Sequence, residues 1–280
     1  AQNLAKAGHT VKIFDLNDDA VKALTSRGFI VAASAGEAAR DVDAVVTMLP
    51  AGEHVRAVYT EVGGVIACSA PGTLFLDCST IDVETARLVS EASGEAGMQM
   101  VDAPVSGGVA AANAGTLTFM VGGADDAFIK AKTILNNMGQ KIVHAGASGA
   151  GQAAKICNNM LLAITMIGTS EAFHLADKLG LDRQKLFDIS SNASGQNWSM
   201  TSYCPVPGPV PTSPANNDYK PGFATAMMLK DLNLAMEAAT SSGANTPLGA
   251  HARDLYTTYS DGGNANMDFS GIFNFIQEKA

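Results

Sequence analysis

The chain changes character at the stretch Gly146-Ala-Ser-Gly-Ala-Gly-Gln-Ala-Ala-Lys-Ile-Cys-Asn-Asn159. Before it, short β-branched runs alternate with alanine-rich segments whose apolar residues recur every three or four positions. After it, the segment from Gln152 to Leu179 is typical of one long helix, apolar almost all round, which must therefore be buried. We predict an α/β domain over residues 1–149 and an all-helical domain over residues 150–280, which begins with this long interdomain helix.

The first domain is predicted to hold a doubly wound sheet of the Rossmann type, because strand-like and helix-like segments alternate along it. This rhythm is typical of a parallel sheet covered by helices. The clearest helices are Ala20 to Arg27, Val83 to Ala96 and Asp126 to Met138, and Gly139 stops the last of them. The predicted strands are Val11 to Phe14, Phe29 to Ala32, Ala44 to Leu49, Thr73 to Asp77, Met98 to Asp102, Leu117 to Val121 and Ile142 to His144.

The second domain shows no convincing strand. The segment Tyr203 to Gly222 contains six prolines, too many for a helix or a central strand, so we expect a long ordered loop there. Further helices are predicted at about Arg183 to Asn192, Thr225 to Ser241, Leu248 to Ser260 and Phe269 to Lys279.

Composition narrows the class of ligand. The chain has 280 residues, 47% of them apolar and 16% charged, which favours a folded globular protein. Its net charge is −9, and it has no Lys/Arg run that could neutralise a phosphate backbone or an anionic membrane. The most apolar stretch, Met160 to Gly168, is too short to span a bilayer. We expect a small-molecule ligand, with neither nucleic acid nor membrane as a partner.

The cysteines indicate a reducing compartment without a structural metal. There are four of them, none in a C-x-x-C pair, and no histidine is placed to complete a zinc site. Residues Ala1 to Gly8 carry neither the charged nor the apolar region of a secretory signal. We expect a cytoplasmic protein, or a mitochondrial matrix protein if the source is a eukaryote.

The dinucleotide-binding signature is incomplete in this sequence. A doubly wound sheet usually binds its cofactor at a glycine-rich turn after the first strand, but no G-x-G-x-x-G occurs here. Residues Ala1 to Gly8 are typical of the end of the helix that follows such a turn. We therefore expect the first strand and its turn ahead of Ala1; the alternative is a truncated protein with impaired cofactor binding.

Three predicted strand ends carry residues suited to a cofactor. Asp15 ends the strand that starts at Val11, where an acidic side chain binds the ribose hydroxyls and repels a 2′-phosphate, which favours NAD over NADP. A turn residue or helix cap is an equally good reading of Asp15. Pro50 and Thr80 follow two other strands, although a strand stop and a helix cap explain them better when the residues stand alone.

Two further segments are candidates for binding and converting the substrate. Ser106, Gly107 and Gly108 follow a strand that breaks at Pro104, and their hydroxyl and backbone N–H groups could bind a carboxylate; the alternative is an ordinary flexible turn.

Lys155 lies one turn inside the long helix, with Asn159 on the same face. A lysine among small and apolar residues is costly to bury unless it is partnered or used, although many such lysines reach solvent. Lys230 and Asp231 also stand in an apolar helix, where one solvated face is the simpler reading.

These segments together resemble the 3-hydroxyisobutyrate dehydrogenase branch of the β-hydroxyacid dehydrogenase family, nearly end to end. The resemblance rests on Asp102 to Gly108, Gly115 to Gly123, Gly146 to Asn159 and Met228 to Leu232. The run Lys155 to Leu162 and the pair Asn197-Trp198 are more similar to this branch than to its tartronate semialdehyde or 6-phosphogluconate relatives.

The resemblance implies a role for each candidate residue. Lys155 falls on the catalytic lysine, Asn159 on a substrate-orienting amide, and Ser106, Gly107 and Gly108 on the carboxylate-binding turn. Trp198 and Asp231 border the substrate. The implied cofactor contacts are Leu49, Pro50, His54, Thr80 and Lys230, in addition to Asp15.

The implied reaction is NAD-dependent oxidation of 3-hydroxyisobutyrate, a small 3-hydroxy acid, to methylmalonate semialdehyde in valine breakdown. One alternative is a reductase of tartronate semialdehyde or of another short semialdehyde. The other is a non-catalytic binding protein on the same fold. Because the long helix is so apolar, we also expect a homodimer or homotetramer built through the second domain, as the resemblance implies; the alternative is a monomer whose later helices cover it.

Overall fold

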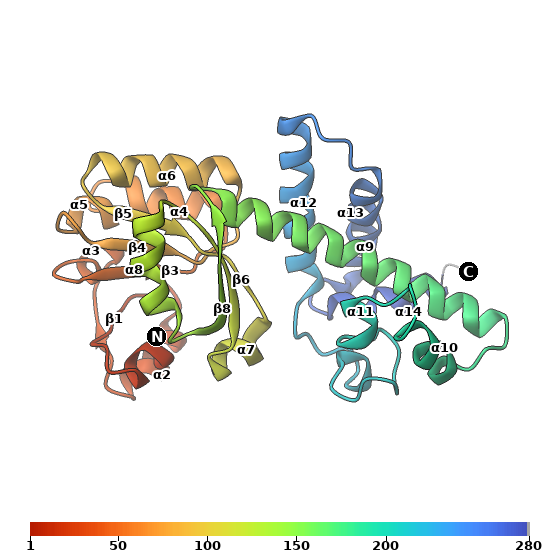
Figure 1. Ribbon diagram of the computed structural model, residues 1–280. Coiled ribbons are helices and arrows are strands. Elements are labelled where there is room, and N and C mark those ends of the chain that lie inside the picture. Colours follow the sequence, from red (N-terminus) through yellow and green to blue (C-terminus); the bar gives the residue numbers. More distant parts are fainter. Residues whose placement is uncertain (279–280) are drawn as a thin grey trace. The chain divides into compact units, whose positions relative to one another are not determined.

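The computed structural model describes residues 1–278 and divides into two compact units, Ala1–Lys155 and Ile156–Ala280 (Figure 1). The division falls inside the long helix α9 (Ala150–Lys178), which contributes its first residues to one unit and the rest to the other. Residues 279 and 280, including the predicted helix end at Lys279, lie outside the described residues.

The first unit is built on a six-stranded sheet whose strand order is β3-β4-β5-β7-β6, with β8 also paired to β7. Strands β3, β4 and β5 are parallel and in register, whereas β7 runs antiparallel to β5 and to β6. The sheet is therefore mixed, not wholly parallel as the sequence rhythm suggested. Its strands are β3 (Ala44–Thr47), β4 (Leu74–Asp77), β5 (Gln99–Asp102), β6 (Val105–Ser106), β7 (Leu117–Gly122) and β8 (Gly139–Gly146).

The two earliest predicted strands form a sheet of their own. Strand β1 (Lys12–Ile13) pairs in parallel with β2 (Ile30–Val31), and each is shorter than predicted. Within residues 1–278, neither of them pairs with β3.

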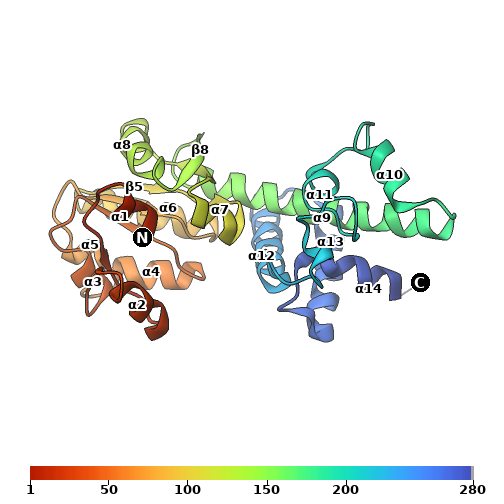
Figure 2. The ribbon, with the colours of Figure 1, turned by 90° about the horizontal axis from the view of Figure 1, so that it is seen from below.

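Helices cover both faces of the six-stranded sheet, and Figure 2 shows α8 on one side of it and α4 on the other. Asn17, Ser34 and Asp82 cap α2, α3 and α6 through their side chains. The helices of this unit are α1 (Gln2–Lys6), α2 (Asp18–Thr25), α3 (Ala35–Ala38), α4 (Gly52–Thr60), α5 (Val65–Cys68), α6 (Val83–Glu95), α7 (Gly108–Ala114) and α8 (Asp125–Leu135).

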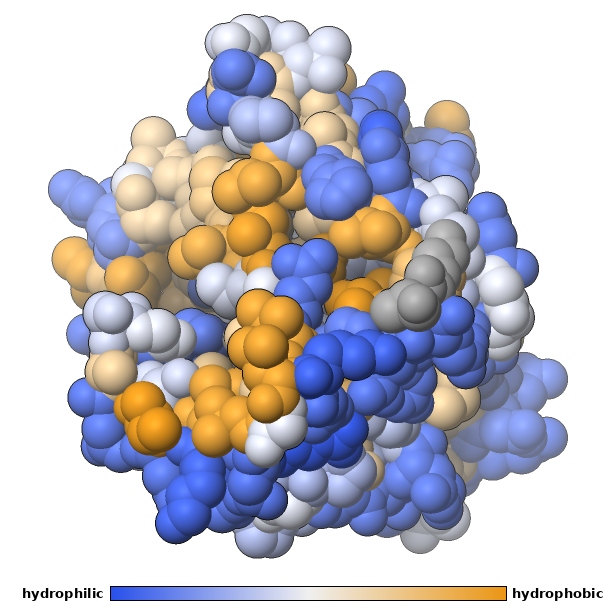
Figure 3. Space-filling view, turned by 90° about the vertical axis from the view of Figure 1, so that its right-hand side faces the viewer, coloured by the Kyte–Doolittle hydropathy of each residue, from blue (hydrophilic) through white to orange (hydrophobic). Residues whose placement is uncertain are grey.

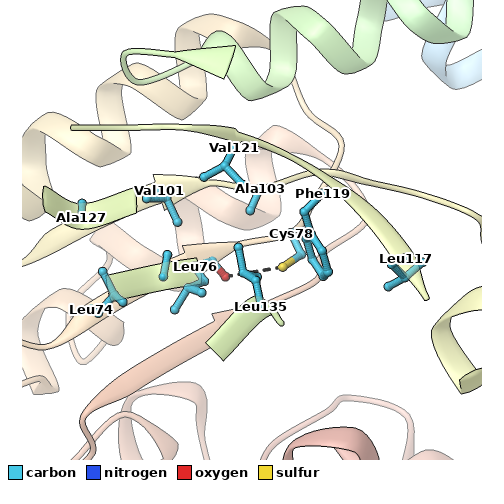
Figure 4. Close-up of a cluster of buried hydrophobic side chains, with 11 residues drawn as sticks. Leu74, Leu76, Cys78, Val101, Ala103, Leu117, Phe119, Val121, Ala127 and Leu135 are labelled. Carbon is cyan, nitrogen blue, oxygen red and sulfur yellow. Dashed lines mark hydrogen bonds between the residues drawn. The ribbon is translucent and has the colours of Figure 1, made fainter. Parts of the chain in front are cut away.

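The central strands are apolar on both faces because a helical layer covers each face. Leu76 and Val101 belong to the cluster under α8, which Figure 4 shows in close-up. Phe75 and Met100, one position earlier on the same strands, belong to the cluster under α4 and α6. Adjacent strand residues point to opposite faces, so these near-continuous apolar runs are what a doubly covered sheet requires.

Gly139 plays a different part from the one predicted. Helix α8 already ends at Leu135, and Gly139 is the buried first residue of β8. A Cβ atom there would lie 2.6 Å from the Leu117 carbonyl oxygen and 2.6 Å from the Phe119 ring. Glycine is required at this position by close packing against β7.

The second unit is helical, and the described part of it has only one isolated β-bridge, between Ala224 and Asp268. No helix among residues 1–278 is long and apolar enough to cross a membrane. After α9, the elements are α10 (Arg183–Ser190), α11 (Trp198–Thr201), the 3₁₀ turn η1 (Pro214–Asn216), α12 (Thr225–Ser242), α13 (Pro247–Tyr259), the π-helical turn η2 (Ser260–Asn264), the 3₁₀ turn η3 (Phe269–Gly271) and α14 (Ile272–Glu278).

Helix α9 is buried on one side only. Ala163 and Met166 pack into a cluster with Met228 of α12 and Tyr256 of α13. The opposite side carries an exposed apolar stripe, which we define as Cys157, Leu161, Gly168, Ala172 and Leu175, with Leu161 60% and Leu175 58% exposed. Within the single chain this side of α9 is thus uncovered, and its cover by a second copy stays a prediction.

The proline-rich segment is an ordered loop, as predicted. Its residues Cys204 and Val206 are buried in a cluster with Phe173 of α9. The Tyr219 hydroxyl donates to the Pro205 carbonyl at 2.8 Å, which ties the two ends of the loop together.

Candidate active site

The carboxyl ends of β3, β4 and β5 meet at one edge of the sheet. Their last residues, Thr47, Asp77 and Asp102, are direct register partners because the three strands are parallel. This edge of an open α/β sheet is the usual place for a bound ligand. The segments that leave it carry most of the first unit's predicted site residues.

Ser79 ties two of these segments together. Its hydroxyl accepts the Leu49 N–H at 2.8 Å and donates to Asp77 Oδ1 at 2.6 Å. Pro50 and Thr80, the neighbours of Leu49 and Ser79, are therefore held on the same side of β3 and β4. The structure thus brings these predicted cofactor contacts together.

A buried hydrogen-bond chain lies beneath these segments. The Thr47 hydroxyl donates to Asp77 Oδ1 at 2.8 Å, and the Tyr59 hydroxyl donates to Thr47 at 2.8 Å. Burial raises the pKa of the Asp77 carboxyl, while the hydrogen bonds from Ser79 and Thr47 act in the opposite direction. Asp77 Oδ2 is buried without a hydrogen-bond partner among the described residues. Sequence reasoning missed this chain, because Thr47, Tyr59 and Asp77 come from β3, α4 and β4 and meet only when these elements pack together.

Asp102 caps the start of α9. Its carboxylate accepts the Gly149 N–H at 2.7 Å and the Gln152 N–H at 2.9 Å. Two groups that would otherwise be orphaned at the helix start are satisfied in this way. Gly151 packs against the Met120 carbonyl oxygen and leaves no room for a side chain. The glycine-containing segment before Lys155 therefore packs tightly between β5, β7 and the start of α9.

Lys155 is 7% exposed and lies one turn inside α9. Asn159 follows four residues later on the same continuous helix and is 2% exposed. Residues four apart lie on the same helix face, so α9 places the Lys155 side chain beside the Asn159 amide, as predicted.

The backbone of the Ser106 turn adopts conformations that favour glycine. Ser106 ends β6, a short strand that sequence reasoning missed, and pairs with Thr118. Gly107 and Gly108 have φ values of 131° and 66°, which other residues rarely adopt. Both glycines are exposed at the start of α7.

In the second unit, Asn159 and Asp231 are joined directly. The Asn159 side-chain N–H donates to Asp231 Oδ2 at 2.5 Å, and Asp231 is 3% exposed. The reading of Lys230 and Asp231 as a solvated face is therefore wrong for Asp231. Lys230 Nζ lies 4.0 Å from Asp231 Oδ1. Burial lowers the pKa of Lys230, and the nearby Asp231 charge opposes that change.

The remaining candidates lie nearer the surface. Trp198, the first residue of α11, is 52% exposed and stacks on Tyr203 with ring centroids 5.1 Å apart. His54 is exposed in α4, with Nδ1 3.8 Å from a carboxylate oxygen of Glu53.

Asp15 is exposed just beyond β1, where its carboxylate accepts the Asn17 N–H at 2.8 Å. The turn reading of Asp15 is thus seen, whereas the helix cap is Asn17.

A separate open groove of about 530 Å³ lies in the second unit. It is lined by Asp177, Arg183 and the loop residues Pro207 to Pro209, among others. None of the predicted site residues lines it. Arg183 and Asp177 offset each other's charge through a hydrogen bond of 2.6 Å. Asp182, which also lines the groove, caps α10 by accepting the Lys185 N–H.

Comparison with known proteins covers both units. The family model for the NAD binding domain of 6-phosphogluconate dehydrogenase matches residues 1–146. A second model, for NAD-binding of NADP-dependent 3-hydroxyisobutyrate dehydrogenase, matches residues 149–276.

Individual relatives extend over nearly the whole chain. The probable 3-hydroxyisobutyrate dehydrogenase of Mycobacterium tuberculosis is 51% identical, over 99% of this chain and 93% of the relative. An NAD-dependent L-serine dehydrogenase of Pseudomonas aeruginosa is 48% identical, over 97% of this chain and 91% of the relative.

A solved structure of the M. tuberculosis 3-hydroxyisobutyrate dehydrogenase with L-serine superposes with a TM-score of 0.94. It is 51% identical in sequence, over 98% of this chain and 93% of that one. Since sequence and fold agree across both units, the chain belongs to the 3-hydroxyisobutyrate dehydrogenase family of NAD-dependent oxidoreductases.

Proposed function

We propose that the protein oxidises 3-hydroxyisobutyrate to methylmalonate semialdehyde with NAD, and that Lys155 is the general base. The observation that carries this proposal is the burial of Lys155 on a capped, tightly packed helix start, one turn before Asn159. An ammonium is costly to bury in such a place unless it is partnered or used by the reaction, and the family resemblance implies a catalytic lysine at this position.

The roles of the residues follow from their chemistry. The Ser106 turn donates hydrogen bonds to the substrate carboxylate, and the substrate hydroxyl meets Lys155 and the Asn159 amide. Lys155 accepts the hydroxyl proton during oxidation and returns it in the reverse direction. A general base must be uncharged to accept a proton, whereas free lysine, with a pKa of about 10.4, is charged at neutral pH. Apolar surroundings disfavour the charged form of a lysine and so favour the base role.

The strand-end segments fit a dinucleotide. Leu49, Pro50 and Thr80 are held side by side through Ser79, above a buried carboxyl oxygen that has no partner among the described residues. When bound, NAD supplies the acceptor for the hydride that leaves the carbinol carbon. His54 and Lys230 would add contacts, and the exposed Asp15 carboxylate would bind the ribose hydroxyls and favour NAD over NADP.

Steady-state assays with a panel of short 3-hydroxy acids, using NAD and NADP in parallel, test the function. We expect the highest kcat/KM for 3-hydroxyisobutyrate with NAD. A higher kcat/KM for D-glycerate would instead favour a tartronate semialdehyde reductase. Failure of the full-length protein to bind NAD in isothermal titration would favour a non-catalytic binding protein.

L-serine oxidation is the second candidate. A relative 48% identical to this chain is named NAD-dependent L-serine dehydrogenase, and the M. tuberculosis structure is described with L-serine. L-serine carries the same carboxylate and 3-hydroxyl as 3-hydroxyisobutyrate, so the Ser106 turn and Lys155 could serve both acids. Including L-serine in the panel separates the two, because the larger kcat/KM identifies the substrate.

We also propose that the protein forms a homodimer or homotetramer through the second unit. The exposed apolar stripe of α9 supports this proposal, because burying these apolar side chains against a second copy is more favourable than leaving them in water. Figure 3, which faces the second unit, shows apolar residues gathered in patches among polar ones. The net charge of −9 gives no reason to propose nucleic acid or an anionic membrane as a partner.

The proposed reaction places the protein in valine breakdown. All four cysteines are free, which supports a reducing compartment such as the cytoplasm, or the mitochondrial matrix in a eukaryote.

A further inference from the structure

We propose that Gln152 is a positioning residue that fixes the Thr80 segment of the cofactor site to the helix that carries Lys155. This inference rests on the proposed function, because it assigns the residue that sets the distance between two parts of the same site.

The side chain of Gln152 holds both peptide groups around Thr80. Its Nε2 donates to the Ser79 carbonyl at 2.8 Å, and its Oε1 accepts the Ile81 N–H at 3.1 Å. Gln152 is fully buried, so no water competes for these bonds. One amide therefore satisfies a donor and an acceptor on either side of the same residue.

The backbone of Gln152 is fixed as well. Its N–H donates to Asp102 Oδ2 at 2.9 Å, which anchors the residue to the end of β5. Lys155 lies three residues further along α9, on a neighbouring part of the same helix face. Gln152 thus joins the ends of two strands to the turn of helix that presents the base.

The link extends to the second cofactor segment through Ser79. The hydroxyl of Ser79 holds the Leu49 N–H, while its carbonyl is held by Gln152. Nearby glycine packing leaves little room for the helix start to shift, since Gly151 lies against the Met120 carbonyl oxygen. A change at residue 152 is therefore expected to move the Thr80 segment away from Lys155.

Glutamine is specified by chemistry at this position. A deprotonated glutamate has two acceptors, so it would accept from Ile81 N–H but repel the Ser79 carbonyl. A protonated glutamate has one donor and one acceptor, as glutamine does. Methionine has a similar length but satisfies neither group.

Gln152→Glu and Gln152→Met, made in the full-length protein, test the proposal. For Gln152→Glu we expect kcat about 10- to 100-fold below wild type at pH 9, because small misplacements of reacting groups have effects of this size. The ratio of variant to wild-type kcat should rise about tenfold by pH 6, as the introduced buried carboxyl takes up its proton. The Asp77 and Asp102 carboxyls and the Lys155 side chain are present in both proteins, so a ratio that stays constant with pH for Gln152→Met, which adds no charge, assigns the rise in Gln152→Glu to the introduced carboxyl.

For Gln152→Met we expect the same loss of kcat at every pH, with the KM for the hydroxy acid within twofold of wild type. Since it adds no buried charge, this variant keeps the test decisive if Gln152→Glu does not fold. Gln184→Glu is the matched control: Gln184 is exposed on α10 and its side chain bonds the Asp188 side chain. Its kcat should match wild type throughout.

Two results would overturn the proposal while leaving the function standing. One is a kcat within twofold of wild type for both variants. The other is a loss of activity in Gln152→Glu that stays constant from pH 6 to pH 9 and parallels a lower unfolding midpoint, which a purely structural role would produce. A wild-type protein that oxidises no acid of the panel would overturn the proposed function itself.

Discussion

At Lys155 a cationic side chain is only 7% exposed on a helix that begins with small and apolar residues. The Lys155→Ala variant should lower kcat by about 100-fold or more, because a positioned acid–base group contributes roughly that factor. NAD binding by isothermal titration should be nearly unchanged.

Lys178→Ala, at an exposed position near the other end of α9, is the control and should keep wild-type kcat. A kcat for Lys155→Ala within fivefold of wild type would rule out the assigned role.

Asp77 provides a prediction about pH. Burial raises the pKa of its carboxyl in the folded state, so the folded protein binds this proton more tightly than the unfolded chain does. The contribution of Asp77 to stability is therefore greatest below the unfolded pKa of about 3.9 and falls as pH rises through the raised folded pKa.

The Asp77→Asn variant carries an amide that does not ionise, so it lacks this pH-dependent loss of stability. Its free energy of unfolding in urea, relative to wild type, should therefore increase between pH 4 and pH 7. A difference that does not change with pH, or that changes in the opposite direction, would contradict the assigned shift. The charge of Asp102 is one cause of the raised Asp77 pKa, so the measured difference includes the coupling between the two carboxyls.

At the level of elements, the start of β8 depends on Gly139. A Cβ atom there would overlap the Leu117 carbonyl and the Phe119 ring, so Gly139→Ala should lower the free energy of unfolding by about 1–3 kcal/mol. Gly94 is the matched control. It lies within α6 with no atom within 4 Å of an added Cβ, so Gly94→Ala should raise stability by about 0.5–1 kcal/mol. Equal effects in chemical denaturation would show that packing at β8 is not the cause.

The longer elements could be predicted because local patterns specify them. The main strands and long helices lie where apolar periodicity places them, with ends shifted by a few residues. The two-residue strand β6 and the short helices α3 and α5 were missed, since their stability comes from distant partners. Val105, for example, pairs with Phe119. The reversed direction of β7 was missed for the same reason.

The same reasoning explains which site residues were found. Lys155, Asn159 and the Ser106 turn stand out because their residue types are unusual in their local setting. Asp102 and Gln152 do not, since each acts on residues far away in sequence: Asp102 on Gly149, and Gln152 on the Ser79 carbonyl. Only the packing of the start of α9 against the strand ends reveals their role.

For the molecule as a whole, the apolar stripe of α9 predicts the state of assembly. A carboxylate at Leu161 or Leu175 would have to be desolvated in any contact that covers the stripe. The double variant Leu161→Glu/Leu175→Glu should therefore have a mass near 28.8 kDa by light scattering at micromolar concentration, while wild type has twice or four times that mass.

Ile129→Glu is the control for this experiment. Ile129 is 66% exposed on α8 of the first unit, so its exposure is similar but it lies outside the stripe. This variant should assemble as wild type does. A wild-type mass near 28.8 kDa would rule out the proposed assembly.

Of the four cysteines, one lies in the stripe and is accessible to a labelling reagent. Cys78 and Cys204 are buried, and burial raises the pKa of Cys204 to about 11, which suppresses the thiolate. Cys68 is half-buried and donates to the Gly63 carbonyl. Cys157 alone among them is exposed, one turn before Leu161.

An alkylating reagent should therefore modify the native chain first at this one thiol. If a second copy covers the stripe, iodoacetamide should modify wild type slowly and the Leu161→Glu/Leu175→Glu variant rapidly, as followed by intact mass. Equal rates in the two proteins would place the contact elsewhere. The helix that carries the proposed base thus also carries a native chemical reporter of whether the protein is alone or assembled.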